Sequence, residues 1–179
     1  MGPKRSLKAR ALQYLAQREQ SRLELGRKLL PHAQAAESAA AAIEGGVGDV
    51  PARASALARV EAVLDWLTTH DYLSQERFVE SRVHARASRF GNLRIRQELQ
   101  QHAVALAPAA AQALKDSELD RARDVRSRKF PEPPANAAEQ ARQMRFLMGR
   151  GFSPEVIRRV LRDAASAGAE PPEPAAFGD

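Results

Sequence analysis

The sequence predicts an all-α fold built from tandem three-helix modules. Ala, Leu, Arg, Glu and Gln dominate the composition, and aromatic residues make up only 5%. Apolar residues recur at the i, i+3, i+4, i+7 spacing of amphipathic helices. Nine helical segments sort into three groups of three, and the second and third groups are offset by roughly 45 residues. Modules this short bury little surface alone, so we expect them to stabilise one another in an elongated molecule, straight or curved.

The first module is predicted to span residues 1–73. Ser6 is placed to cap its first helix, because a short polar side chain can bind the free amides of a helix start. Ser21 and Glu24 have the spacing of a capping box for the second helix. Pro31 should end that helix or mark a break shortly after it.

A change in composition at about 34–52 predicts a flexible insertion within the first module. This stretch is alanine-rich and then glycine-rich, with almost nothing large to bury. Its glycines lack the Gly-Lys-Ser/Thr of a phosphate-binding loop, so we interpret it as a linker. Order returns in a third helix with an apolar stripe of Val60, Val63, Leu64 and Leu67. We expect Trp66 and Tyr72 to lock helices together rather than to stack on bases.

The second module is predicted to span 74–116. Its first two helices should be capped by Ser74 and Asn92 and joined by a turn at Phe90–Asn92, and an alanine-rich helix follows. Tyr72, Leu73 and Phe78 would fix it to the first module. No acidic residue lies between Ser81 and Gln97. The arginines there suggest a surface kept positive for a partner: Arg82, Arg86, Arg89, Arg94 and Arg96.

The third module is predicted to span 117–166, and residues 167–179 should form a disordered tail. Ser117 should cap its first helix with Asp120 as capping partner, and Phe152 should fold back onto the second helix after Gly149 and Gly151. Ser153-Pro154-Glu155 is typical of a helix start. A second set of arginines could contact a partner: Arg142, Arg145, Arg150, Arg158, Arg159 and Arg162. By contrast, Arg121, Arg123, Arg126 and Arg128 alternate with acids, as on a solvated surface.

The composition excludes several function classes. There are no cysteines, so disulfides and thiol catalysis are excluded, and the four histidines lack metal-binding spacing. No catalytic motif appears, so we expect no enzyme activity, cofactor or metal site. No apolar run approaches the roughly 20 residues that cross a bilayer, and no signal peptide is evident, which favours a cytoplasmic protein. The net charge of +6 favours a polyanion or an acidic protein surface as partner.

Several motifs, in order, resemble the RecX family of regulatory proteins. They are SLKARALQYLAQREQSRLELGRKL, DYLSQERFVESRV, the run from Arg94 to Leu99, and RFLMGRGFSPEVIRRVL. The similarity covers about residues 6–165 without the insertion. It implies three-helix modules that bind the RecA recombinase filament, in its groove or at its growing end. Such binding inhibits ATP hydrolysis and strand exchange, and so modulates homologous recombination, DNA repair and the SOS response.

The alternative is a helical protein that binds nucleic acid without sequence specificity and affects its partners indirectly. Single- or double-stranded DNA is therefore a second partner to consider, although no recognition helix for base-specific reading stands out. In either case, we expect a monomer that uses the two sets of arginines as its contact residues.

Overall fold

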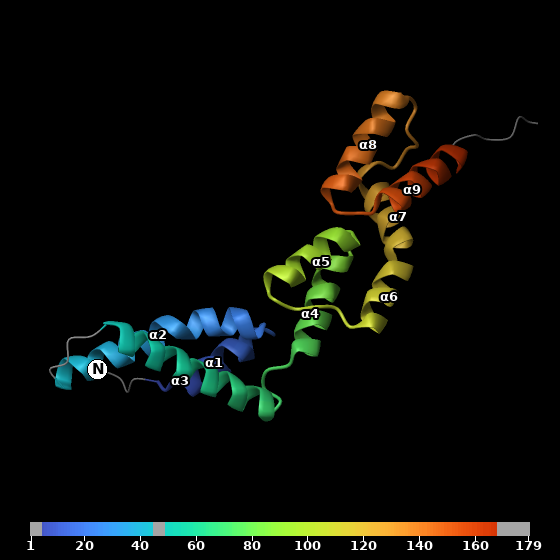
Figure 1. The fold of residues 1–179 in the computed structure, drawn as a ribbon. Coiled ribbons are helices and arrows are strands. Elements are labelled where there is room, and N and C mark those ends of the chain that lie inside the picture. Colours follow the sequence, from blue (N-terminus) through green and yellow to red (C-terminus); the bar gives the residue numbers. More distant parts are fainter. Residues whose placement is uncertain (1–4, 45–48, 168–179) are drawn as a thin grey trace, which may run out of the picture. The chain divides into compact units, whose positions relative to one another are not determined.

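A computed structural model describes residues 5–44 and 49–167 of the chain. Within these ranges the protein forms nine α-helices and no strand, which confirms the all-α fold class (Figure 1). The helices are α1 (Leu7–Gln17), α2 (Arg22–Glu44), α3 (Asp49–Thr69), α4 (Gln75–Ala87), α5 (Asn92–Gln101), α6 (Pro108–Asp116), α7 (Glu118–Lys129), α8 (Ala137–Gly149) and α9 (Pro154–Ala167).

The helices form two compact units. Unit 1 comprises the chain up to Arg82 together with Leu99–Ala105, and unit 2 comprises Val83–Glu98 and the chain from Leu106 onward. Helices α4 and α5 therefore each contribute residues to both units. The division of the chain into three modules stays a prediction, and the predicted tail from residue 168 lies outside the described residues.

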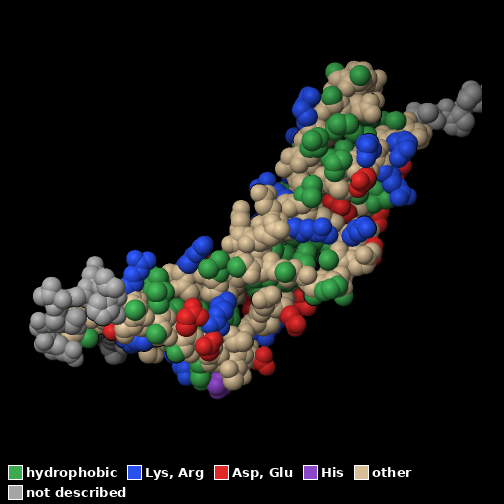
Figure 2. All heavy atoms as spheres, viewed as in Figure 1, with side chains coloured by type: hydrophobic (Ala, Val, Ile, Leu, Met, Phe, Trp, Pro, Cys, Tyr) green, Lys and Arg blue, Asp and Glu red, His purple; other side chains and the backbone are tan. Residues whose placement is uncertain are grey.

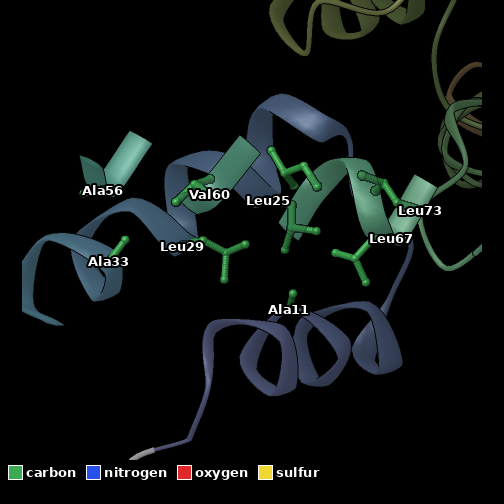
Figure 3. Close-up of a cluster of buried hydrophobic side chains, with 9 residues drawn as sticks. Ala11, Leu25, Leu29, Ala33, Ala56, Val60, Leu67 and Leu73 are labelled. Carbon is green, nitrogen blue, oxygen red and sulfur yellow. The ribbon is translucent and has the colours of Figure 1, made fainter. Parts of the chain in front are cut away.

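The core of unit 1 lies between α1, α2 and α3 (Figure 3). The predicted stripe of α3 is confirmed, since Val60, Leu64 and Leu67 are buried. Trp66 packs against this core and stacks on Tyr72, although Tyr72 itself is 49% exposed. The buried set consists of Ala11, Leu25, Leu29, Ala33, Ala56, Val60, Leu64, Leu67 and Leu73.

Helix α2 continues well beyond the point where the sequence predicted a flexible insertion. It passes through Pro31, so the prediction that this proline ends the helix or marks a break shortly after it is wrong. Helix α2 reaches Glu44 and α3 begins at Asp49, so most of 34–52 is helical, and its role as a flexible insertion stays a prediction. Proline removes only one donor from the helix, and packing against α3 outweighs that loss. Ala33 is fully buried, and Glu37 forms an ion pair with Arg59 of α3. Residues 45–48, in the glycine-rich part of the predicted insertion, lie outside the described residues.

Three of the predicted serine caps are confirmed. The hydroxyl oxygens of Ser6, Ser21 and Ser74 accept hydrogen bonds from backbone amides three residues later, at 3.1–3.2 Å. The predicted cap at Ser117 is wrong, because its backbone is already helical and its hydroxyl donates to the carbonyl of Ala113 at 3.0 Å. A cap needs extended backbone, so this residue continues the chain from α6 into α7.

The core of unit 2 is formed by α7, α8 and α9. The predicted apolar stripe of α9 is confirmed by the burial of Ile157, Val160 and Leu161. Phe152 folds back as predicted. It is 1% exposed, and its amide donates to the carbonyl of Leu147 at 3.3 Å.

The pH dependence of unit 1 stability provides a test of the ion pairs at the start of α2. Partial burial raises the pKa of Glu24, but hydrogen bonds and charges from Arg18 and Lys28 outweigh it and hold the pKa below its usual 4.5. The stabilisation is thus fully present above pH 4.5 and is lost as the pH falls through the folded-state pKa. Between pH 6 and pH 3, we expect E24Q to lose less free energy of unfolding than the wild type, by about 0.5–1 kcal/mol.

Chemical denaturation at the two pH values measures this difference. The matched control is E80Q, which changes an exposed glutamate on α4. A wild-type-like pH profile for E24Q would contradict the prediction.

Candidate binding surface

Two turns of unit 2 meet backbone to backbone. The turn between α4 and α5 donates from the Gly91 amide to the Arg150 carbonyl at 2.9 Å and from the Leu93 amide to the Gly151 carbonyl at 3.0 Å. A Cβ atom on Gly91 would lie 2.2 Å from the Gly151 oxygen and 2.3 Å from the Phe152 nitrogen. Real Cβ atoms do not approach backbone this closely, so the contact requires glycine at position 91.

A buried carboxylate lies beside this contact. Glu118, at the start of α7, is 4% exposed. Its oxygens accept hydrogen bonds from the amide and the side-chain nitrogen of Asn92, both at 3.0 Å, and from the amide and hydroxyl of Ser153, both at 3.2 Å. One carboxylate therefore joins α7 to the starts of α5 and α9.

This network corrects the prediction that Asn92 caps α5. The Asn92 side chain donates to Glu118, and its oxygen accepts from Arg121 at 2.6 Å. The carbonyl of Gly91 instead begins the helix by accepting the amide of Ile95 at 3.2 Å. The Asn92 side chain therefore hydrogen-bonds to Glu118 and Arg121, which are distant in the sequence, instead of capping the start of α5 as local spacing predicted.

Arg121 was predicted to lie on a solvated surface, and that prediction is wrong. Its guanidinium donates to the carbonyls of Phe90 at 2.8 Å and Leu114 at 2.9 Å as well as to Asn92. Burial lowers the pKa of Arg121, although the Glu118 charge opposes the shift. Arg121 thus positions the turn that carries Phe90. Its alternation with acids along α7 gave no signal of this role.

Arg126, predicted to be solvated like Arg121, is also buried. It is 8% exposed, and its Nε donates to the Gln143 side chain at 2.9 Å. Arg123 and Arg128 are exposed, as that prediction expected. The alternation of arginines with acids therefore predicted exposure correctly for only two of the four arginines on α7.

Four guanidinium groups surround the ring of Phe90. Their carbon atoms lie between 4.8 and 6.0 Å from the ring centroid, in the range of cation–π contacts. The nearest belongs to Arg94 at 4.8 Å, followed by Arg150 at 5.6 Å, Arg89 at 5.9 Å and Arg86 at 6.0 Å. We call Phe90 with these four arginines the Phe90 cluster.

A chain of aromatic contacts extends from the Phe90 cluster along α8. Arg150 also lies 5.0 Å from the ring of Phe146, which packs edge-to-face against Phe130 at 5.3 Å. The guanidinium of Arg142 lies 5.8 Å from the Phe130 ring. Arginines and aromatic rings from α8 and the two adjoining turns therefore form one connected series.

The structure brings together only part of the predicted arginine set. Arg86, Arg89, Arg94 and Arg150 form the Phe90 cluster, and Arg142 lies at the far end of the aromatic series. Five others are exposed on α5, α8 and α9 without joining the cluster: Arg96, Arg145, Arg158, Arg159 and Arg162. Arg82 belongs to unit 1, where it lies 3.7 Å from Glu24.

Acidic groups neutralise some of these arginines but not all. Arg86 makes a forked ion pair with Glu98, at 2.9 and 3.1 Å, so the expectation that this run lacks acidic partners is wrong for Arg86. Glu98 lies in α5, the next helix along the chain, just beyond the acid-free run in the sequence. Within the described part of the chain, Arg89, Arg94 and Arg150 form no ion pair.

The arginines of α9 have a different environment. Arg123 of α7 binds Asp163 at 2.7 Å. This hydrogen bond lowers the pKa of Asp163, and the charges of Arg159 and Arg162 lower it further. Figure 2 shows basic side chains interspersed with acidic and apolar ones, with several basic side chains next to one another at the upper right. Within the described residues, Arg158, Arg159 and Arg162 also form no ion pair, so the Phe90 cluster is distinguished by the gathering of its arginines around one ring.

The fold and this surface define an all-helical protein with an arginine-rich surface around one aromatic ring. The described helices include none long and apolar enough to span a membrane. Within the same residues, no group of three or more His, Asp or Glu side chains could hold a metal ion.

Comparisons with known proteins identify the family. Residues 74–114 match a family model described as the second three-helix domain of RecX, and residues 116–161 match its third three-helix domain. The chain is 50% identical over 165 residues to the regulatory protein RecX of Leptothrix cholodnii, covering 89% of this chain and 90% of that protein. The chain belongs to the RecX family of regulatory proteins.

Two further relatives bear the same description. The regulatory protein RecX of Ralstonia nicotianae is 46% identical over 162 residues, covering 89% of this chain and 88% of the relative. That of Neisseria meningitidis is 31% identical over 166 residues, covering 92% and 94%. The similarity thus includes unit 1 as well as the two domains that the family models match.

Substitution of the two glycines tests whether the backbone contact holds unit 2 together. We expect G91A to lower the free energy of unfolding by about 3 kcal/mol, because its Cβ would overlap backbone atoms that cannot move independently. Gly149 is the matched control, since a Cβ there meets nothing within 4 Å and the residue is helical. G149A should be neutral or stabilising by about 0.5–1 kcal/mol. Equal effects of the two substitutions, measured by urea denaturation, would show that the contact is not required.

Proposed function

We propose that this RecX-family protein binds the RecA–DNA filament, in its groove or at its growing end, and inhibits RecA ATPase and strand exchange. By doing so it modulates DNA repair, homologous recombination and the SOS response. It acts by binding rather than catalysis, as a cytoplasmic monomer without cofactor or metal.

The Phe90 cluster is the observation that carries the proposal. Three cations that lack ion pairs within the described residues gather around one ring, Arg89 and Arg94 from the second RecX three-helix domain and Arg150 from the third. Like charges placed this close repel one another, so an anionic partner surface would relieve the repulsion. A guanidinium stacked on an aromatic ring can still use the N–H groups at its edge to bind a carboxylate or phosphate in a forked geometry. Arg150 already donates one N–H to the Arg89 carbonyl at 3.3 Å, and its other N–H groups could make such contacts.

The remaining predicted arginines provide further contacts along the filament. Arg142 would extend the surface along α8, and Arg96 and Arg145 are exposed on α5 and α8. Arg158, Arg159 and Arg162 would serve α9, and Arg82 would serve unit 1. Weak contacts spread over tandem domains combine into strong binding, since each contact raises the effective concentration of the next.

The DNA-dependent ATPase of RecA tests this function directly. Titration of the wild-type protein should inhibit ATP hydrolysis by RecA on single-stranded DNA. The R89Q/R94Q/R150Q variant should require at least about tenfold more protein for half-inhibition, because it loses three hot-spot cations.

The matched control is R18Q/R59Q/R123Q, which removes the same number of charges from three arginines that are already ion-paired on the surface. Such pairs contribute little, so this variant should inhibit as the wild type does. Absence of inhibition by the wild type at several-fold excess would exclude the proposed function. Equal weakening of both variants would assign the effect to net charge alone.

The alternation of arginines and aromatic rings also supports the alternative function, nonspecific nucleic-acid binding with indirect effects on partners. This function requires affinity for bare DNA that falls steeply with salt, by roughly one unit of log slope per phosphate neutralised. Fluorescence anisotropy with labelled single- and double-stranded oligonucleotides measures that slope. Negligible binding near physiological salt would exclude this alternative.

A further inference from the structure

Two large apolar side chains of unit 2 are exposed at the contact between its two turns. Leu93 is 54% exposed and Met148 is 57% exposed. Their backbones meet at Gly151, because the Leu93 amide donates to the Gly151 carbonyl at 3.0 Å and the Met148 carbonyl accepts the Gly151 amide at 2.9 Å. No other large hydrophobic residue in the described part of unit 2 is this exposed.

These apolar side chains are carried by the same two turns as cations of the Phe90 cluster. Arg94 follows Leu93 directly in α5, and Arg150 follows Met148 by two residues at the end of α8. The same two turns thus carry exposed aliphatic groups and three unneutralised guanidiniums. Aromatic, Met and Arg side chains are enriched in protein–protein interfaces relative to the rest of the surface.

This composition fits protein better than nucleic acid. A phosphate backbone would satisfy the arginines but would place charged oxygens against Leu93 and Met148, which gain only from contact with apolar groups. Single-stranded DNA would instead stack its bases on open aromatic faces. The Phe90 ring offers little open face, because four guanidinium groups already lie within 6.0 Å of its centroid.

We propose that Leu93, Met148 and the Phe90 cluster form a docking surface for an acidic protein segment that presents an apolar side chain flanked by carboxylates. The apolar side chain contacts Leu93 and Met148, and the carboxylates bind Arg89, Arg94 and Arg150. The inference rests on the proposed function, since it assigns the segment to the RecA subunits of the filament rather than to the DNA within it.

A double substitution tests the apolar part of the surface. L93Q/M148Q should weaken sedimentation with RecA filaments on single-stranded DNA by at least about tenfold and leave binding to bare DNA and its salt dependence unchanged. The matched control is L57Q, which changes an aliphatic side chain of unit 1 that is 43% exposed. L57Q should change filament binding less than twofold. Both variants alter exposed positions, so thermal denaturation should show wild-type folding.

A photo-crosslink identifies the partner. Because the chain contains no cysteine, L93C provides one unique site for a benzophenone maleimide. Irradiation of the labelled protein on filaments should attach it to a RecA peptide in which an apolar residue has acidic neighbours. Attachment to the DNA strand, or wild-type filament binding by L93Q/M148Q, would overturn the inference and leave the proposed function intact. A wild-type protein that does not bind filaments would contradict the proposed function, and this inference with it.

Discussion

The carboxylate of Glu118 is the interaction on which the organisation of unit 2 depends. A buried charge is unfavourable unless it is fully hydrogen-bonded, and Glu118 accepts bonds from Asn92 and Ser153, at the starts of two different helices. With the backbone contact at Gly91, it fixes the α4–α5 turn against the α8–α9 turn. Phe90 comes from the first turn and Arg150 from the second, so Arg150 joins the other three arginines of the Phe90 cluster only while the two turns are joined.

Much of the fold could be predicted because it depends on short-range periodicity. The apolar stripes of α3 and α9, and the caps at Ser6, Ser21 and Ser74, need only residues within one or two turns. The course of α2 beyond Pro31 could not be predicted in this way. There, packing of small side chains against α3 overrides the local tendency of proline to end a helix, and alanine gives a weak signal because it is compatible with both linker and core.

The candidate site was only partly predictable, for a related reason. An acid-free run in the sequence identified Arg86, Arg89 and Arg94, yet the structure pairs Arg86 with Glu98 from the next helix. Arg150 joins them from a distant turn, whereas Arg96 lies in the same run but outside the cluster. Arg121 was missed because its role depends on carbonyls brought to it by tertiary folding. The sequence shows which charged residues could bind a partner, and the tertiary contacts of the turns determine which of these residues lie together.

The amide hydrogens of Gly91 and Leu93 have a consequence for the dynamics of this surface. Both are donated across the junction, to the carbonyls of Arg150 and Gly151. They can therefore exchange with solvent only when the two turns separate, and the same opening removes Arg150 from the Phe90 cluster. A partner that binds the assembled cluster stabilises the closed state by mass action. Protection of the Gly91 and Leu93 amides from hydrogen exchange therefore reports whether a partner occupies the Phe90 cluster.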